Sequence, residues 1–126
     1  MSTVKANDLT NVTGGIPTVK SQHLIPTAWV NFNGTGTVAI RDSENVSSIT
    51  DVAVGLYSIT FATAMANTNY SVSGSVVGST NALYYSFISP RGVALSTTQV
   101  PFSIMHNNGT LNDQEAVSLI ILGGQA

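Results

Sequence analysis

The chain has no cysteine, only four basic and six acidic residues among its 126, and a single tryptophan. Without cysteine it can form no disulfide, no cysteine-ligated zinc site and no thiol nucleophile. Charged residues make up 8% of the sequence, compared with about a quarter in an average globular protein. Because uncharged polar surface costs less to desolvate than charge, this shortage favours a surface that is covered by copies of the protein or by partners.

Long apolar runs and clusters of basic residues are also missing. No stretch of about 20 apolar residues could span a bilayer, and residues 1–8 lack the apolar segment of a signal peptide. The sequence therefore predicts synthesis in a cytoplasm and no membrane insertion. Nucleic-acid binding is not expected either, because it needs clustered cations, and the four here, in a chain of net charge −2, are scattered: Lys5, Lys20, Arg41 and Arg91.

The length and composition predict one folded domain preceded by an arm. A chain of 126 residues that is 43% hydrophobic is sufficient for one modest core. Residues 1–23 show no regular period, and Gly14, Gly15 and Pro17 interrupt any element there. We expect residues 1–23 to form an extended attachment arm that becomes ordered on a partner, and residues 24–126 to form the folded knob.

Short strands separated by turn residues are predicted for most of the knob. The first two, at 29–32 and 37–42, flank Asn33, Gly34, Thr35 and Gly36, and Asn and Gly tolerate the positive φ angles that a tight hairpin needs. A polar turn at 43–45 leads to the next strand. The later strands are expected at 46–50, 56–63, 70–76, 83–89, 99–106 and 117–122.

The alternation of side chains predicts which faces these strands bury. Apolar and polar residues alternate along 56–63 and 70–76, as in half-buried strands. Residues 117–122 are apolar on both faces, which is typical of a central strand covered on both sides, whereas Pro101 suggests an edge strand or a strand start. Since no stretch has a helical period, the predicted fold is all-β, an antiparallel β-sandwich of jelly-roll type.

One part of the knob resembles a known family. The segment AWVNFNGTGTVAIR at 28–41, followed by NVSSITD at 45–51, resembles a module found in fibre-type proteins of tailed bacteriophages. The passage YSITFATAMANTNY at 57–70 is similar to the family pattern Y-x-[IV]-x-F-x-T-A-M-x-[DN]-x-N-Y, and the opening STVKAN is similar to a tag of marine phage fibres. The chain departs from the family at 52–56, where VAVGL replaces a polar turn, which suggests burial against a neighbour.

The resemblance implies a structural protein of the virion, usually a homotrimer, and no enzyme or cofactor. We expect a short tail-fibre or tip component that contributes to host contact and attaches to other virion proteins through the arm. The alternative is a capsid decoration protein that clamps neighbouring capsid subunits. The expected location is therefore the surface of the virion.

Two pairs of carboxylates have the spacing of a possible glycosidase acid–base pair. Residues two apart on a strand point the same way, at a separation of about 6.5–7 Å, which suits that chemistry. The simpler interpretation, solvated carboxylates in polar turns, is favoured for both pairs: Asp42 with Glu44, and Asp113 with Glu115. His23 and His106 lie in no metal-ligand pattern, although a trimer could bring three copies of one histidine to its axis.

The remaining candidates are aromatic. Tyr84 and Tyr85 are adjacent, so on a strand one of them faces outward, where it could stack on a host surface glycan or anchor an interface. Trp29 is expected in the core or at a subunit interface. The same alternatives, core or trimer anchor, hold for the three phenylalanines of predicted strands: Phe32, Phe61 and Phe102.

Overall fold

The computed structural model describes residues 25–78, 86–90 and 93–125, the second of these ranges by its backbone only. These residues form eight strands and no helix. The bounds of the strands are β1 (Ala28–Asn33), β2 (Ala39–Glu44), β3 (Val46–Ala53), β4 (Leu56–Phe61), β5 (Tyr70–Val77), β6 (Ser86–Pro90), β7 (Gln99–His106) and β8 (Ala116–Gly123).

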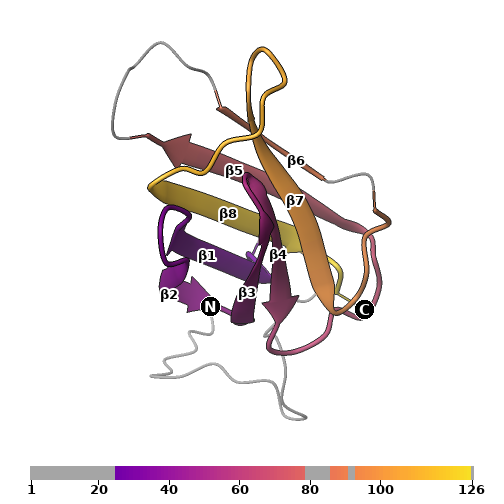
Figure 1. Cartoon of the computed structure of the whole chain (residues 1–126). Coiled ribbons are helices and arrows are strands. Elements are labelled where there is room, and N and C mark those ends of the chain that lie inside the picture. Colours follow the sequence, from indigo (N-terminus) through magenta and orange to yellow (C-terminus); the bar gives the residue numbers. More distant parts are fainter. Residues whose placement is uncertain (1–24, 79–85, 91–92, 126) are drawn as a thin grey trace, which may run out of the picture.

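The strands form two four-stranded sheets, in which every neighbouring pair is antiparallel. The first sheet has the order β2-β1-β8-β5, and the second has the order β3-β4-β7-β6. Figure 1 shows that the strands of the second sheet run across those of the first. The all-β antiparallel fold predicted from the sequence is thereby confirmed, and the arrangement is consistent with a β-sandwich.

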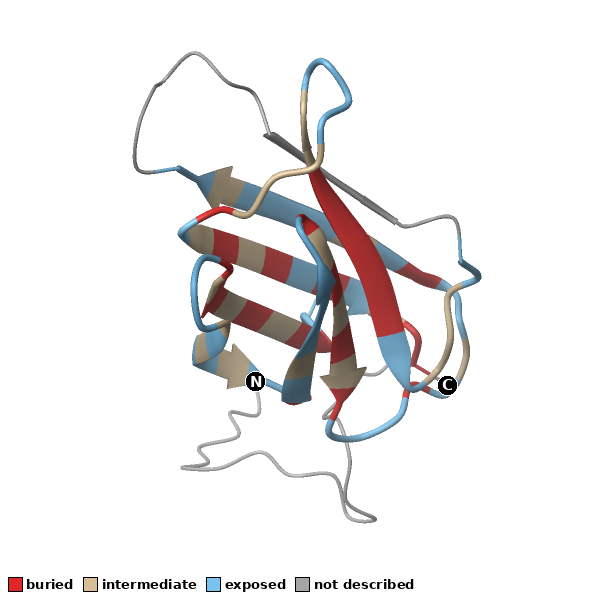
Figure 2. Ribbon diagram, viewed as in Figure 1, coloured by how far each residue is buried: buried red, intermediate tan, exposed pale blue. Residues whose placement is uncertain are grey.

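The core lies between the two sheets. Strands β1, β4 and β8 bury alternate residues, whereas β7 buries five consecutive residues, from Val100 to Ile104. Figure 2 shows the alternation as red bands along β1 and β8, and the buried stretch of β7 as continuous red. Three aromatic rings meet at its centre: Phe32 from the first sheet lies 5.3 Å from Tyr57 and 6.0 Å from Phe102, centroid to centroid. Edge-to-face contacts of this kind stabilise a core beyond the area that they bury.

The predicted hairpin is present as β1 and β2, but its turn works differently from the expectation. Of Asn33, Gly34 and Gly36, only Gly36 has a positive φ, 62°. Gly34 is needed because a Cβ there would lie 2.8 Å from the Gln114 carbonyl oxygen. The Asn33 side chain closes the turn by donating from Nδ2 to the Thr35 carbonyl, at 2.7 Å.

The turn predicted at 43–45 is reduced to one residue. Ser43 and Glu44 belong to β2, and Asn45 alone turns the chain from the first sheet to the second, with a φ of 54°. No other described non-glycine residue has a positive φ. A single left-handed residue suffices because Asn tolerates this conformation and its side chain bonds to neighbouring backbone.

The sequence predicts that β8 is a central strand with both faces covered. The first part is confirmed and the second is wrong for the described residues. The strand is central, with β1 on one side and β5 on the other. Its inner face, which includes Leu119 and Ile121, is buried, but its outer face is exposed at Ile120 and Leu122. No described residue covers these two side chains, because the second sheet packs on the inner face only.

Candidate interaction surfaces

The outer face of the first sheet carries an apolar patch, which we call the outer patch. It consists of Trp29, Ile120 and Leu122. Trp29 lies opposite Ile120 in the β1–β8 pairing, and Leu122 follows two residues later on β8, so it points to the same side. Ile120 is 48% exposed and Leu122 39%, while Trp29 is half-buried.

The surroundings of the outer patch are polar but mostly uncharged. On the β5 side, Ser73 lies opposite Ile120 and Ser71 opposite Leu122. Farther along β1, Asn31 donates from Nδ2 to the Ser118 hydroxyl at 2.8 Å, so this pair is already satisfied. The apolar side chains of the outer patch therefore have no apolar neighbours on the same face, other than one another, among the residues described.

A second apolar surface lies at the end of the β3–β4 hairpin. Val52 is 47% exposed and Val54 is 60% exposed, and we call this pair the valine tip. It is the segment at which the chain departs from the family pattern. Both side chains of the valine tip are exposed, and none of the described residues covers them.

The valine tip is held in place by bonds to β7 and to the loop between β7 and β8. The Gly55 N–H donates to Asp113 Oδ1 at 2.7 Å, and the Ile104 N–H donates to the Gly55 carbonyl at 2.8 Å. The Tyr57 hydroxyl lies 2.5 Å from the same Asp113 oxygen and 2.8 Å from the Gly34 carbonyl. Asp113 thus holds the hairpin that carries the valine tip, and the Tyr57 hydroxyl connects that hairpin to the turn between β1 and β2.

This buried contact affects the acid–base behaviour of Tyr57. Burial raises the pKa of the Tyr57 phenol well above its ordinary value, and the hydrogen bond to Asp113 and the charge of Asp113 raise it further. The phenol has one proton and faces two acceptor oxygens. A negative charge on Tyr57 would lie beside the Asp113 carboxylate, so the phenol stays protonated.

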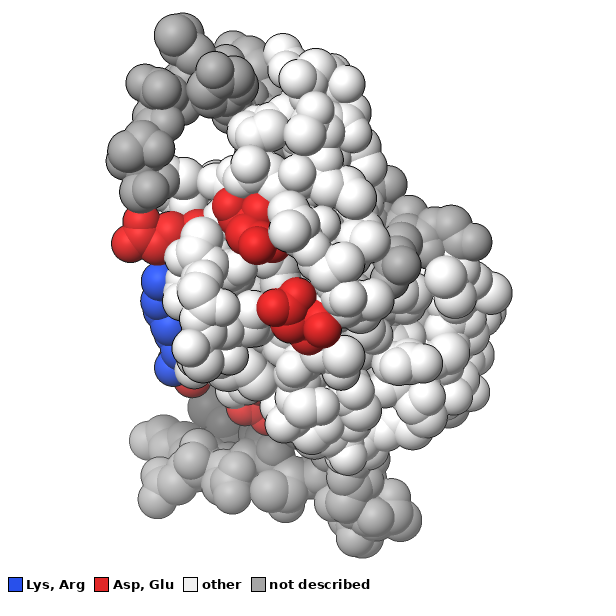
Figure 3. Space-filling view, in the orientation of Figure 1, with Lys and Arg blue, Asp and Glu red and all other residues white. Residues whose placement is uncertain are grey.

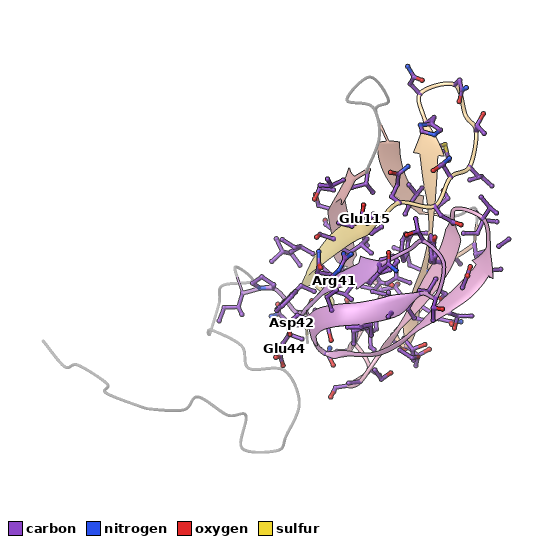
Figure 4. All side chains as sticks on the ribbon, turned by 60° about the vertical axis from the view of Figure 1, so that its left-hand side comes forward. Arg41, Asp42, Glu44 and Glu115 are labelled. Atoms are coloured by element: carbon purple, nitrogen blue, oxygen red, sulfur yellow. The ribbon has the colours of Figure 1, made fainter. Side chains whose placement is uncertain are left out.

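Charged side chains gather along one edge of the first sheet. Figure 4 shows Arg41, Asp42, Glu44 and Glu115 along this side, and Figure 3 shows how few charges the rest of the visible face carries. The Arg41 guanidinium donates to the backbone carbonyls of Phe32 and Glu115, at 3.2 and 2.8 Å. Arg41 is the only Lys or Arg among the described residues, so this edge is acidic on balance.

The two candidate carboxylate pairs differ in their surroundings: both members of one pair are exposed, whereas one member of the other is hydrogen-bonded inside the fold. Asp42 and Glu44 lie on the exposed outer face of β2, opposite Asn31 and Trp29. Asp113 is taken up by the bonds described above, whereas Glu115 is exposed. No group of three or more potential metal-ligating side chains occurs in the part of the chain that the structure describes.

The aromatic candidates are separated by the fold. Phe32, Phe61 and Phe102 lie in the core, and Trp29 lies on the outer patch. Tyr84, Tyr85 and His23 fall outside the described residues. His106 ends β7, on the second sheet.

Sequence reasoning did not identify the structural role of Asp113. Its partners lie 56 and 58 residues away in the chain, at Tyr57 and Gly55. No local pattern marks such a contact. The valine tip was visible in the sequence as an apolar turn, which is unusual because turns between strands are normally polar.

Comparisons with known proteins add no assignment. No protein-family model matches the chain, and no significant match was found among curated proteins or among solved structures. Within the described ranges, no helix has the length and apolar character that a membrane crossing requires.

Proposed function

We propose that this protein is a structural component of the surface of a tailed-phage virion, in the form of a short tail fibre or fibre tip that contributes to host contact. The resemblance to phage fibre modules supports this proposal, and its most specific residues form the β1–β2 hairpin and the start of β3. The proposal includes no catalysis and no cofactor. Release of reducing ends from host polysaccharide by the purified protein would contradict it.

The observation that carries the proposal is an exposed apolar tip on a domain with very little charge. Soluble monomers rarely expose contiguous apolar patches larger than a few hundred Å², and the bonds to Gly55 hold the two valines side by side at an exposed tip. A contact between this tip and a different surface of the next copy would be head-to-tail, and such contacts can close into a ring. We propose a homotrimer built in this way.

The attachment and the finer fold are part of the same proposal. Residues 1–23 would connect the knob to other virion proteins, and Tyr84 or Tyr85 would be available for a host surface glycan. The jelly-roll assignment is supported by the pairing of β1 with β8, which brings the two ends of the described chain together. The hairpins β1–β2 and β3–β4, which each stay within one sheet, weaken it.

The alternative function is capsid decoration, in which the knob clamps neighbouring capsid subunits. The copy number of the protein in each virion distinguishes the two functions. Quantitative mass spectrometry of purified particles should find a few to tens of copies for a tail component, and hundreds for a decoration protein. Absence from purified particles would contradict both.

A further inference from the structure

We propose that Asn108 is a site of spontaneous deamidation, at which the Gly109 nitrogen attacks the side chain and converts asparagine to aspartate or isoaspartate. The dipeptide Asn-Gly occurs twice in the chain, at 33–34 and at 108–109, and threonine follows it both times. Glycine hinders this attack least, because it has no side chain and the widest choice of backbone angles. Since the two sites share their local sequence, the fold decides which of them reacts.

The reaction needs only water and hydroxide. The peptide nitrogen of Gly109 loses its proton to hydroxide and bonds to Cγ of Asn108, while the bond from Cγ to Nδ2 breaks and Nδ2 takes up a proton from solvent and leaves as ammonia. Water then opens the resulting succinimide ring at either of its carbonyl carbons. One opening gives aspartate, and the other gives isoaspartate, in which the main chain runs through the former side chain. Each product carries one negative charge more than asparagine at neutral pH.

Asn108 lies at the exposed tip of the connection between β7 and β8, which Figure 2 shows in pale blue. Among the described residues its carboxamide has a single hydrogen-bond partner, the Thr110 N–H, which donates to Oδ1 at 3.0 Å. The Gly109 N–H donates to the His106 carbonyl at 2.9 Å, so this bond lies inside the same turn. A Cβ at Gly109 would have no neighbour within 4 Å. The tip therefore has room for a ring, and it can open without loss of a long-range contact.

Asn33 is held far more tightly. Its Nδ2 donates to the carbonyls of Thr35 and Thr37, at 2.7 and 3.3 Å, and its Oδ1 accepts from the Thr35 N–H and hydroxyl, at 3.2 and 2.9 Å. The nitrogen that would attack belongs to Gly34, whose N–H donates to the Gln114 carbonyl at 2.9 Å. A Cβ at Gly34 would lie 2.8 Å from the same carbonyl oxygen. The peptide is therefore enclosed by a distant part of the chain.

These contacts set the expected ratio of the two rates. Reaction at Asn33 requires the loss of five hydrogen bonds, four of its carboxamide and one of Gly34, whereas reaction at Asn108 requires the loss of two. Asn108 should therefore react at least about tenfold faster in the folded protein, a ratio that one or two additional hydrogen bonds are enough to produce.

Peptide mapping of the full-length protein measures both rates in one sample. Trypsin cleaves after Lys20, Arg41 and Arg91, so peptide 21–41 carries one Asn-Gly site and peptide 92–126 carries the other. The folded protein is incubated at mildly alkaline pH, digested at intervals and analysed by mass spectrometry, which detects the replacement of an amide by a carboxyl group. The second peptide should convert at least about ten times faster than the first. In guanidinium chloride the two should convert at similar rates, because the protection by the fold is lost.

Glutamine variants identify the residue that reacts. Glutamine is one methylene longer than asparagine, so the same attack would have to close a larger ring. An acidic species with one more negative charge should accumulate in the unmodified protein and in N33Q, and it should elute with N108D in ion-exchange chromatography. N108Q should not form it.

Three results would overturn the proposal. Equal rates for the two peptides in the folded protein would mean that the fold does not distinguish the sites. Conversion of peptide 92–126 in guanidinium chloride but not in the folded protein would mean that the tip protects Asn108 as well. Formation of the acidic species in N108Q would assign the reaction to another residue.

Discussion

At the scale of single residues, Asn45 stabilises the fold through both its backbone conformation and its side-chain hydrogen bonds. Its Nδ2 donates to the carbonyls of Thr27 and Thr63, at 3.0 and 3.2 Å, and its Oδ1 accepts from the Thr63 N–H at 2.7 Å. These bonds join the start of β1 to the connection between β4 and β5. Because Asn45 also adopts a left-handed conformation, the two contributions can be separated by mutation.

We expect Asn45→Gly to lower the free energy of unfolding by about 1–3 kcal/mol, because it removes the three side-chain bonds. Asn45→Ala should lower the free energy of unfolding by about 1 kcal/mol more, because a left-handed backbone conformation is less favourable for alanine than for glycine. Urea unfolding of the two variants measures the difference. Equal stability of the two would show that the backbone conformation of Asn45 contributes nothing.

Tyr57 makes the stability of the protein sensitive to alkaline pH. Its pKa is raised in the folded state above the ordinary value of 10.0, so unfolding releases a proton once the pH exceeds that value. Stability is therefore complete below pH 10 and should fall above it, by about 1.4 kcal/mol per pH unit for one such group. The pKa of Tyr70 is raised as well, mainly by burial, which adds to the slope.

Tyr57→Phe should reduce the loss of unfolding free energy above pH 10 by about 1.4 kcal/mol per pH unit, because the variant has one phenol fewer to ionise on unfolding. It should also lower the stability at pH 7 by about 1–3 kcal/mol, because the Asp113 and Gly34 acceptors lose their common donor. Unfolding curves collected between pH 8 and pH 11 test both effects. An unchanged slope in the variant would mean that Tyr57 is ionised as easily in the folded protein as in the unfolded chain.

At the scale of elements, the turn between β1 and β2 contains two glycines that are needed for different reasons. Gly36 has a positive φ and open space around it, whereas Gly34 has no room for a Cβ next to Gln114 and the Tyr57 hydroxyl. Asparagine tolerates a positive φ but is larger than the space at Gly34. The same substitution should therefore have opposite outcomes at the two positions.

Gly36→Asn should change the free energy of unfolding by less than about 0.5 kcal/mol, while Gly34→Asn should lower it by about 1–3 kcal/mol through overpacking. Thermal or urea unfolding of both variants provides the measurement. Glu44→Ala serves as the control, and it should have little effect because Glu44 is exposed on β2. Comparable losses at positions 34 and 36 would contradict the distinct roles of the two glycines.

The elements that were predicted well are those whose signal is local. The alternation around Tyr57 predicted a strand at 56–63, and β4 begins at Leu56 but ends at Phe61, while the expected strand 99–106 matches β7 in its bounds. Pro101 predicted an edge strand or a strand start. β7 is not an edge strand, because it lies between β4 and β6, but Pro101 is its third residue and so lies near its start.

Features that depend on distant parts of the chain could not be predicted. Gly34 is packed by Gln114, which is 80 residues away, and Asp113 holds Gly55 of the β3–β4 turn from 58 residues away. On β5, the serines are exposed as expected, but Gly74 is exposed too, because it has no side chain to bury and β5 lies at the edge of its sheet. Sequence patterns specify which face of a strand is apolar, not what covers that face.

At the scale of the whole molecule, charge and apolar surface are segregated. Four of the six charged side chains in the described ranges lie along one edge of the first sheet, as Figure 4 shows. The valine tip and the outer patch carry no charged side chain of their own. Association through these apolar surfaces should depend on burial of apolar area, so it should persist when salt screens the charges.

This separation leads to a test of the proposed homotrimer. Val54→Asp would place a charge at the centre of the contact, and an uncompensated charge in an interface costs more than the apolar area of one valine contributes. Light scattering at micromolar concentration should give three times the 13.1 kDa chain mass for the unmodified protein at low and high salt, and a smaller mass for Val54→Asp. Val93→Asp is the matched control, because Val93 and Val54 are both 60% exposed and Val93 lies away from the valine tip, in the connection between β6 and β7. If the unmodified protein is a monomer, or if both variants remain trimeric, the valine tip is not the contact between subunits.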